Sequence, residues 1–255
     1  MKHNRKPLMQ ETFICLDCET TGLDVDKDEI IEFAAIRFTF KEHLETLETL
    51  IDPKRKISED SIAIHHITDE MVEGKPSIES KLVHFFEFVG PHPIVGHGIG
   101  FDIQMLEQAA RKHNFPFPLH HNPLIDTHRM ARLYGKSPTN SLEALRAHFH
   151  VDPEIAHRAL SDVLVNIEVF KHLCRDYSSL EHILTTLSRP ITLKEMPLGK
   201  HRGRPFREIP YEYLLWASKK DFDQDLSYSI HKELKRRRKG NQFLQEANPF
   251  KHLSF

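Results

Sequence analysis

Short apolar runs separated by polar loops dominate the first part of the chain. Residues 12–17, 30–38 and 47–51 are such runs, and polar loops at 24–29 and 40–46 join them. Apolar runs of this length, rich in β-branched and aromatic residues and bounded by polar clusters, are typical of buried strands. The pattern therefore predicts three strands that pair as an antiparallel meander.

Beyond the meander the spacing of apolar residues changes to that of helices. Residues 77–89 and 101–112 carry apolar positions three and four apart, and the short apolar runs at 93–97 and 123–126 are strand candidates. Further helices are predicted at 126–133, at 141–149 and within 157–187. Strands alternating with helices after an opening meander predict an α/β fold with a mixed sheet.

The length of 255 residues suits one α/β domain with a small appendage. Arg189-Pro190 interrupts the last helical pattern, and a compact segment follows it. The sequence thus predicts a main domain at 10–187, a small basic module at 191–239 and a flexible tail at 240–255.

Charge is distributed unevenly between these parts. Residues 1–187 carry 20 lysines and arginines against 29 acids, a net of −9, whereas residues 188–255 carry 15 against 8, a net of +7. A basic part joined to an acidic part is the candidate for contact with phosphate. No apolar run is long enough to span a bilayer, so no membrane partner is expected.

Cysteine usage and the amino-terminal segment both bear on the cellular setting. The three cysteines, Cys15, Cys18 and Cys174, are too few for a disulfide framework. Residues 1–11 are basic and polar without an apolar centre, so no signal peptide is expected. A reducing, cytoplasmic setting is predicted.

Two carboxylates stand at the end of the first predicted strand. Asp17 and Glu19 point to the same side of a strand because side chains alternate, whereas Cys18 points into the other face. Neighbouring carboxylates repel unless a cation lies between them, and oxygen ligands alone favour Mg²⁺ or Mn²⁺. The alternative is a solvated surface pair. The acids at 24–28 and 221–225 lack the glycine of a calcium loop, and we interpret both segments as exposed turns or helix caps.

Two further acids occur in apolar surroundings. Asp102 follows a short strand and opens a predicted helix, where the helix dipole alone would also favour it. Asp162 lies among the apolar helix positions Leu160, Val163 and Leu164, and its alternative is a buried, paired structural aspartate, which is uncommon.

Three segments together resemble a known family. Residues 17–22 (DCETTG), 97–102 (HGIGFD) and 157–162 (HRALSD) are similar, in order and spacing, to the three motifs of the DEDDh 3′→5′ exonucleases. Supporting similarities lie at 64–68, 125–132 and 141–145, and the resemblance covers about residues 10 to 175. The family usually has Asn where this chain has Gly98, which removes a local side-chain hydrogen bond.

The resemblance implies an RNase H-like fold, a mixed five-stranded sheet flanked by helices, with four acids in one cleft. Asp17, Glu19, Asp102 and Asp162 would hold two divalent ions, Mg²⁺ with Mn²⁺ as a substitute, that clamp the scissile phosphate. His157 would be the general base for the attacking water. The alternative interpretation is that His157 is an ordinary surface residue, since the chain has nineteen histidines and most of them must lie on the surface.

The same motifs imply where the terminal nucleotide binds. Thr20, Thr21 and Gly22 would offer backbone donors to it, although each also suits a plain turn. Leu23 would wedge against the last base, His97 would line the substrate site, and Phe101 would stack on or wall the sugar. Leu23 and Phe101 also have ordinary packing alternatives.

Residues 194–216 resemble the small module that follows the nuclease domain in exonuclease X-like proteins, with Leu198 in place of the usual Phe. Lys200, Arg202 and Arg204 lie in a predicted tight turn where backbone can approach phosphate. A basic run near the end adds the candidate nucleic-acid contacts Arg236, Arg237 and Arg238. The alternative for that run is a solvated basic helix end.

The aromatic residues of this module admit two interpretations. Tyr211, Tyr213 and Trp216 are either stacking platforms for bases or, as we favour from the sequence, the core of a very small domain.

These observations predict a metal-dependent 3′→5′ exonuclease that releases nucleoside monophosphates from single-stranded DNA or DNA 3′ ends. The alternatives are an exoribonuclease acting on RNA ends or short oligoribonucleotides, and an inactive nucleic-acid-binding or polymerase-tethering module. The presence of all four acids and the histidine argues against the inactive module. A DNA polymerase or repair protein is the predicted protein partner.

Overall fold

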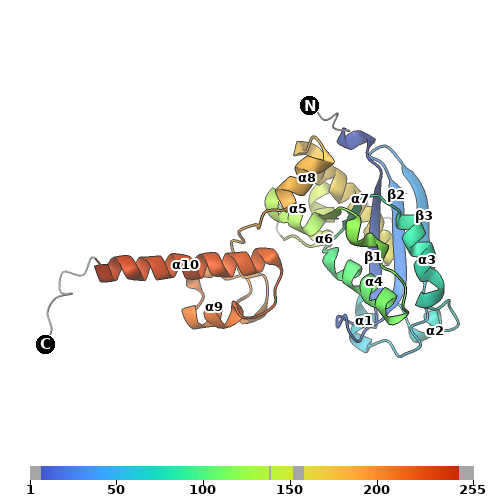
Figure 1. Cartoon of the computed structure of the whole chain (residues 1–255), viewed down its shortest axis with the longest axis horizontal. Coiled ribbons are helices and arrows are strands. Elements are labelled where there is room, and N and C mark those ends of the chain that lie inside the picture. Colours follow the sequence, from blue (N-terminus) through green and yellow to red (C-terminus); the bar gives the residue numbers. More distant parts are fainter. Residues whose placement is uncertain (1–6, 138, 152–157, 247–255) are drawn as a thin grey trace. The chain divides into compact units, whose positions relative to one another are not determined.

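The computed structural model describes residues 7–137, 139–151 and 158–246, with side chains described through residue 239 (Figure 1). The chain divides into two compact units, Met1–Leu187 and Ser188–Phe255. The division follows the end of helix α8 (Leu180–Leu187) and precedes the Arg189-Pro190 step.

A five-stranded mixed sheet forms the centre of the first unit. Its strands are β1 (Phe13–Thr20), β2 (Ile30–Phe38), β3 (His43–Leu50), β4 (Ile94–Gly96) and β5 (Leu124–Asp126). Their spatial order is β3-β2-β1-β4-β5, with antiparallel pairing from β1 to β3 and parallel pairing of β4 with β1 and β5. The opening meander and the mixed sheet predicted from the sequence are confirmed.

Helices cover the sheet and its edges. They are α1 (Glu59–His65), α2 (Asp69–Val72), α3 (Ile78–Val89), α4 (Gly100–Lys112), α5 (Thr127–Tyr134), α6 (Leu142–Phe149), α7 (Ala159–Leu173) and α8, with short 3₁₀ turns η1 (Leu8–Gln10), η2 (Pro118–His121) and η3 (Cys174–Asp176). The helices predicted from apolar spacing are present. Helices α1 and α2 were not predicted from the sequence. In the described part of the chain, no helix is long and apolar enough to cross a membrane.

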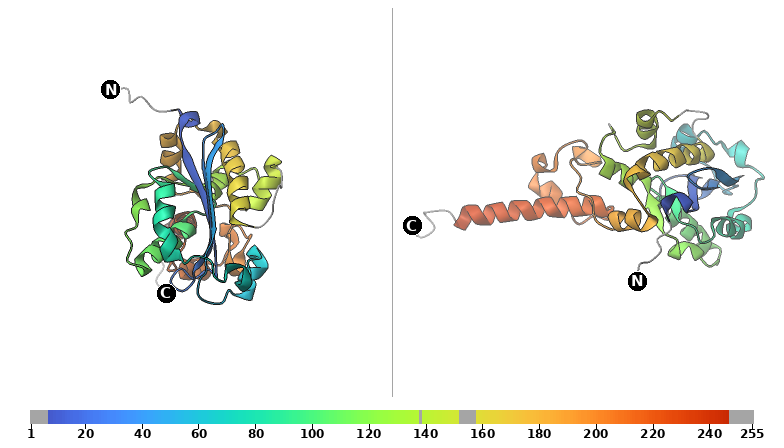
Figure 2. Two further views of the ribbon diagram at one scale, coloured as in Figure 1. Left: turned by 90° about the vertical axis from the view of Figure 1, so that its right-hand side faces the viewer. Right: turned by 90° about the horizontal axis from the view of Figure 1, so that it is seen from above.

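Side-chain alternation along β1 divides the core between the two faces of the sheet. Phe13 and Cys15 pack on one face with residues of α5, α6, α7 and α8. Ile14, Leu16 and Cys18 pack on the other face with α3 and α4. Figure 2 shows the sheet between these two groups of helices. Cys18 therefore points into the core, as predicted, and Asp17 and Glu19 face the side of α7.

The second unit has a core of its own. Helices α9 (Tyr211–Ala217) and α10 (Gln224–Glu246) pack with the 3₁₀ turns η4 (Gly199–His201) and η5 (Phe206–Glu208). Its buried residues are Met196, Phe206, Ile209, Leu214, Ala217, Leu226, Ile230 and Leu234. Helix α10 continues to Glu246, so residues 240–246 are helical where the sequence predicts a tail.

Of the two interpretations that the sequence allows for the acids at 221–225, an exposed turn or a helix cap, the structure shows the helix cap. Asp223 accepts hydrogen bonds from the backbone N–H groups of Asp225 and Leu226 and so caps α10. Asp225 is fully buried and accepts a hydrogen bond of 2.9 Å from the backbone N–H of Ile191. Asp225 thereby connects the start of the second unit to α10. This role is structural, and the segment is not a calcium-binding loop.

Candidate active site

The carboxyl end of β1 forms the floor of an acidic site. In the described part of the chain, β4 pairs with β1 only at Ile14 and Cys15, so β1 extends past the end of its parallel neighbour. Asp17 and Glu19 lie on this extension, on the face that α7 covers. Ligand sites in α/β sheets commonly form beyond the carboxyl ends of parallel strands, where space is left between neighbours.

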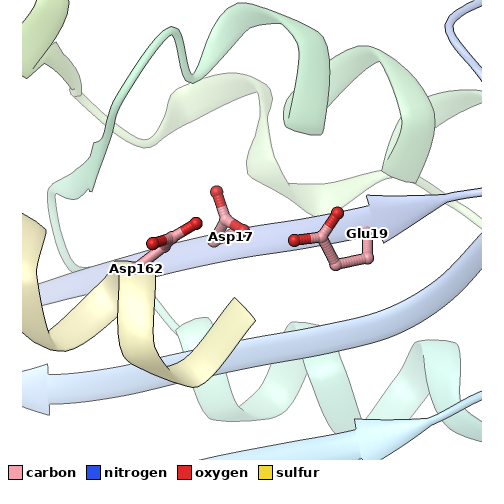
Figure 3. Close-up of side chains that lie close together, drawn as sticks. All are labelled: Asp17, Glu19 and Asp162. Carbon is pink, nitrogen blue, oxygen red and sulfur yellow. The ribbon is translucent and has the colours of Figure 1, made fainter. Parts of the chain in front are cut away.

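Asp162 completes an acidic triad with the two strand carboxylates. It lies in the first turn of α7, where the helix dipole favours a negative charge. One carboxylate oxygen of each of Asp17, Glu19 and Asp162 lies within 4.8 Å of the others, and all three residues are half-buried. Figure 3 shows the three side chains converging from β1 and α7. Residues far apart in sequence thus form one cation-sized cluster of oxygen ligands.

Asp102 lies beside this triad. It occupies the first turn of α4, is 6% exposed, and its Oδ1 accepts a hydrogen bond of 3.0 Å from the backbone N–H of Cys18. Because Cys18 stands between Asp17 and Glu19, this bond holds the fourth acid against the same stretch of β1. One oxygen of Asp102 is therefore committed to the strand.

The electrostatics of the site indicate uncompensated negative charge. Burial, followed by the charges of Asp102, Glu19 and Asp162, holds the pKa of Asp17 well above its usual range. Burial and then Asp162 raise the pKa of Glu19 to about 7, and burial raises the pKa of Asp102 to about 7. These carboxyls resist ionising together unless a cation is present. The oxygen-only donor set fits Mg²⁺ or Mn²⁺.

Glu32 is a site-positioning residue that sequence reasoning missed. It is fully buried on β2, opposite Glu19. Its carboxylate accepts hydrogen bonds from the Arg158 guanidinium and, at 3.1 Å, from the backbone N–H of Ala159, the first residue of α7. Glu32 thereby caps the helix that carries Asp162. The signal available in the sequence was a lone acid within the apolar run 30–38.

The turn after β1 is internally hydrogen-bonded. The Thr20 hydroxyl donates to the Gly22 carbonyl at 2.6 Å, and the Thr21 hydroxyl donates to Asp28 at 2.8 Å. The backbone N–H of Thr21 donates to the Glu29 carbonyl at 2.9 Å. It is therefore not a donor for a nucleotide, and the expectation for that atom is wrong. A Cβ on Gly22 would lie 2.4 Å from an Asp28 oxygen, so any larger residue there would have to displace the Asp28 side chain from its hydrogen bond with Thr21.

Two apolar residues flank the acids. Leu23 follows this turn and is 85% exposed, as a residue that wedges against a base has to be. Phe101 stands next to Asp102 at the start of α4 and is only partly buried against the core. Both positions fit the predicted substrate contacts, which stay predictions.

His97 belongs to a polar chain that leads to α7. Its Nδ1 is 3.0 Å from the Thr127 hydroxyl, which in turn lies 2.7 Å from the Asn166 amide oxygen. Burial, followed by the charge of His128, lowers the pKa of His97 to about 4, so the imidazole is neutral at neutral pH. A neutral ring adds no positive charge to this polar chain. The role of His97 in lining the substrate site stays a prediction.

The departure at Gly98 has a structural reason. Gly98 has a φ of +78°, a conformation that favours glycine, and its backbone N–H donates to Asp126 Oδ1 at 3.0 Å. Asp126 also accepts a hydrogen bond of 2.9 Å from the backbone N–H of His128 at the start of α5. The backbone of Gly98 thus fixes the loop before Asp102 without an asparagine side chain.

A family model described as "Exonuclease" (RNase T) matches residues 14–170, which include all four acids. The epsilon subunit of DNA polymerase III from Aquifex aeolicus is 32% identical over 189 residues, covering 70% of this chain and 93% of that protein. The chain belongs to the DEDD 3′→5′ exonuclease family. The PolC-type DNA polymerase III of Thermotoga maritima is 39% identical over 160 residues, and the exonuclease domain spans only 12% of that polymerase's length.

Solved structures share the fold of the exonuclease domain. Exonuclease X, in a complex with 5′ overhanging duplex DNA, has a TM-score of 0.54 at 25% identity, covering 68% of this chain and 98% of that one. Escherichia coli Exonuclease I with a dT13 oligonucleotide has a TM-score of 0.59 at 20% identity, covering 65% and 41%. The RNase H-like fold is thereby confirmed. A second family model, described as a quorum-sensing-regulated virulence factor, matches residues 184–227.

The predicted general base, His157, lies in the segment 152–157, outside the described residues. The described chain resumes at Arg158, which Glu32 holds at the start of α7. The role of His157 therefore stays a prediction.

The raised pKa values predict how the metal-free exonuclease responds to pH. A folded-state pKa of about 7 for Glu19, against 4.5 for an ordinary glutamate, means that the folded protein holds protons that the unfolded chain has released. Stability in EDTA is therefore expected to fall as pH rises from about 4.5 to about 7. Melting temperatures measured across this range test it. Glu19→Gln should flatten the decline, and a melting temperature that rises with pH would contradict the prediction.

Arg158→Ala is expected to destabilise the exonuclease domain by about 3–5 kcal/mol, because it leaves the buried Glu32 carboxylate without its cation. Urea denaturation measures the loss. Lys27→Ala is the matched control, since it removes an ion pair with Asp24 on an exposed turn and should cost far less stability than Arg158→Ala. Equal effects of the two variants would show that the buried pair does not anchor α7.

Proposed function

We propose that this protein is a divalent-metal-dependent 3′→5′ exonuclease that releases nucleoside monophosphates from DNA. The convergence of Asp17, Glu19 and Asp162 within 4.8 Å, with Asp102 held beside them, is the observation that carries the proposal. The pKa values of Asp17, Glu19 and Asp102 are raised, and gathering four carboxylates in one place is costly without a bound cation. Membership of the exonuclease family gives the reaction that such a cluster serves.

The proposed roles of the residues follow from the family's motifs. Asp17, Glu19, Asp102 and Asp162 would hold two divalent ions, Mg²⁺ in the first instance. When bound, such ions polarise the scissile phosphate and stabilise the negative charge of the reaction. His157 is proposed to remove the proton of the attacking water, since an imidazole has a pKa suited to this at neutral pH. Leu23 and Phe101 would position the terminal nucleotide.

DNA is the proposed substrate because of the proteins that this chain resembles. The Aquifex relative is a subunit of DNA polymerase III, and the structures of Exonuclease X and Exonuclease I were determined with DNA. We propose, by the same likeness, a polymerase or a repair protein as partner. The three cysteines are free and buried, which supports a reducing, cytoplasmic setting.

A degradation assay tests the function directly. Single-stranded DNA, duplex DNA with an overhang and RNA of the same sequence, each labelled at the 5′ end, are incubated with Mg²⁺ and with EDTA. We expect a ladder that shortens from the 3′ end, faster on DNA, and none in EDTA. A 3′-terminal phosphorothioate should block the reaction. Faster decay of RNA would reassign the substrate, and intact strands in both Mg²⁺ and Mn²⁺ would overturn the proposal.

A further inference from the structure

Trp216 is exposed, although its sequence context predicts a core residue. It lies on α9, whose neighbouring residues Leu214 and Ala217 are buried in the core of the second unit. The indole itself is 51% exposed. It is the only tryptophan of the chain. An exposed indole forgoes the stabilisation that its burial would give, so its exposure indicates that the ring binds a ligand or partner.

Other aromatic and cationic groups surround this ring. The Tyr213 ring centroid lies 5.4 Å from that of Trp216, and Lys220 Nζ lies 5.2 Å from the indole centroid. On its other side Tyr213 contacts His201, with ring centroids 4.4 Å apart. A Cβ on Gly199 would lie 3.0 Å from the Tyr213 hydroxyl. The turn that begins at Gly199 therefore packs directly against Tyr213, one member of the aromatic pair.

This turn presents three exposed cations. Gly199 and Gly203 have φ values of +71° and +77°, which allow the chain to reverse tightly. Lys200, Arg202 and Arg204 are exposed on it, and within the described residues the structure shows no ion pair for any of them. Their charges are thus available to a ligand. Two carboxylates offset only part of this charge: Glu212, one helical turn before Trp216, and Glu195, whose backbone bridges Pro205 beside the turn.

The basic run on α10, by contrast, is tied into the module. Arg236 and Arg237 both pair with Glu233, at 2.8 and 2.7 Å. Arg237 also donates to the carbonyl oxygens of Phe206 and Arg207, and Arg238 donates to the Tyr211 hydroxyl. These arginines stabilise the fold of the second unit. The nucleic-acid contact that the sequence suggests at 236–238 is therefore better placed at the turn.

We propose that Trp216, with Tyr213, Lys220 and the cations of the turn, forms a platform on which one base of a single strand stacks. We refer to these residues as the Trp216 platform. An aromatic face stacks on any base, while flanking cations neutralise the adjoining phosphates, so binding is tolerant of sequence. The net charge of +7 on residues 188–255 attracts the polyanion that the acidic first unit repels. The inference rests on the proposed function, because the platform would hold the strand that the exonuclease shortens.

Intrinsic fluorescence reports on the platform directly, because Trp216 is the only tryptophan. The full chain in EDTA is titrated with the single-stranded oligonucleotide dT16, so that the readout does not depend on hydrolysis. Stacking of a base on the indole should quench its emission, with a midpoint that matches the affinity from anisotropy of labelled dT16. Binding by anisotropy without any change in emission would overturn the proposal.

Variants separate stacking from other contributions. Trp216→Ala should weaken dT16 binding by about 5- to 150-fold, the range given by loss of one base–aromatic stack, and Trp216→Phe should retain most of the affinity. Tyr228→Ala is the matched control. Tyr228 is exposed on α10 with Lys232 above its ring, but lies on a different helix from the platform. Equal losses in Trp216→Ala and Tyr228→Ala would overturn the proposal.

The charged part of the platform has its own test. Replacing Lys200, Arg202 and Arg204 together by Gln should reduce the slope of log affinity against log salt by about 0.7 for each phosphate that these cations neutralise in the wild type. An unchanged slope would overturn this part of the assignment and favour a protein partner for the surface.

The platform and the proposed function can fail separately. If dT16 quenches Trp216 and no strand is cleaved with Mg²⁺, the platform stands and the exonuclease proposal fails. If strands are cleaved and Trp216→Ala changes neither the affinity for dT16 nor the KM for long strands, the exonuclease stands and the platform fails.

Discussion

Asp17→Asn is expected to reduce exonuclease activity to below about one thousandth of wild type, since losing about 4 kcal/mol of transition-state stabilisation already costs that factor. Asp17 lies at the centre of the acidic site, between Glu19 and Asp162 and close to Asp102. Removing its charge removes a ligand that the other acids cannot replace. Rates of mononucleotide release with Mg²⁺ measure the effect, and Asp162→Asn should behave in the same way.

The same variant should be at least as stable as wild type without metal. Burial and then the charges of four neighbouring acids raise the pKa of Asp17, so a neutral side chain of the same shape relieves their repulsion. Its melting temperature in EDTA is therefore expected to rise, and the stabilisation of wild type by Mg²⁺ should be largely lost. Asp24→Asn, on an exposed turn, is the control for a lost carboxylate and should leave activity intact. Substantial turnover by Asp17→Asn would refute the site assignment.

His157→Ala is expected to lower kcat by about 10²- to 10⁴-fold, the usual contribution of a general base. The binding of Mg²⁺, followed by calorimetry, should change little, because the oxygen ligands remain. The variant should also lose the fall in rate that wild type shows as pH drops below about 6.5, where an ordinary imidazole becomes protonated.

An exposed histidine provides the control for this variant. His121 lies on the surface at the end of η2, and His121→Ala should leave kcat unchanged. A collapse of Mg²⁺ affinity in His157→Ala would instead identify His157 as a ligand. An unaltered pH profile would assign proton removal to another group.

Much of the fold and the identity of the acids could be predicted from local patterns. Period-two alternation placed Asp17 and Glu19 on one side of β1 and Cys18 on the other, since strand geometry alone dictates this. The limits of β2 and the extents of α3 and α4 agree closely with the apolar spacing, because β2 is buried along its length and each helix buries one regular face. The acids could be identified because carboxylates are uncommon within or at the ends of buried apolar runs unless they are paired or bind a metal.

What the sequence could not give are contacts between distant segments. Glu32 and Arg158 are 126 residues apart, and only the packing of α7 on β2 brings them together and makes Glu32 the cap of the helix that carries Asp162. The exposure of Trp216 also could not be predicted from the sequence. Helix α9 has apolar residues on several faces, and tertiary packing decides which of them are buried. Local chemistry thus determined which residues form the site, while the packing of helices on the sheet decided how they are held.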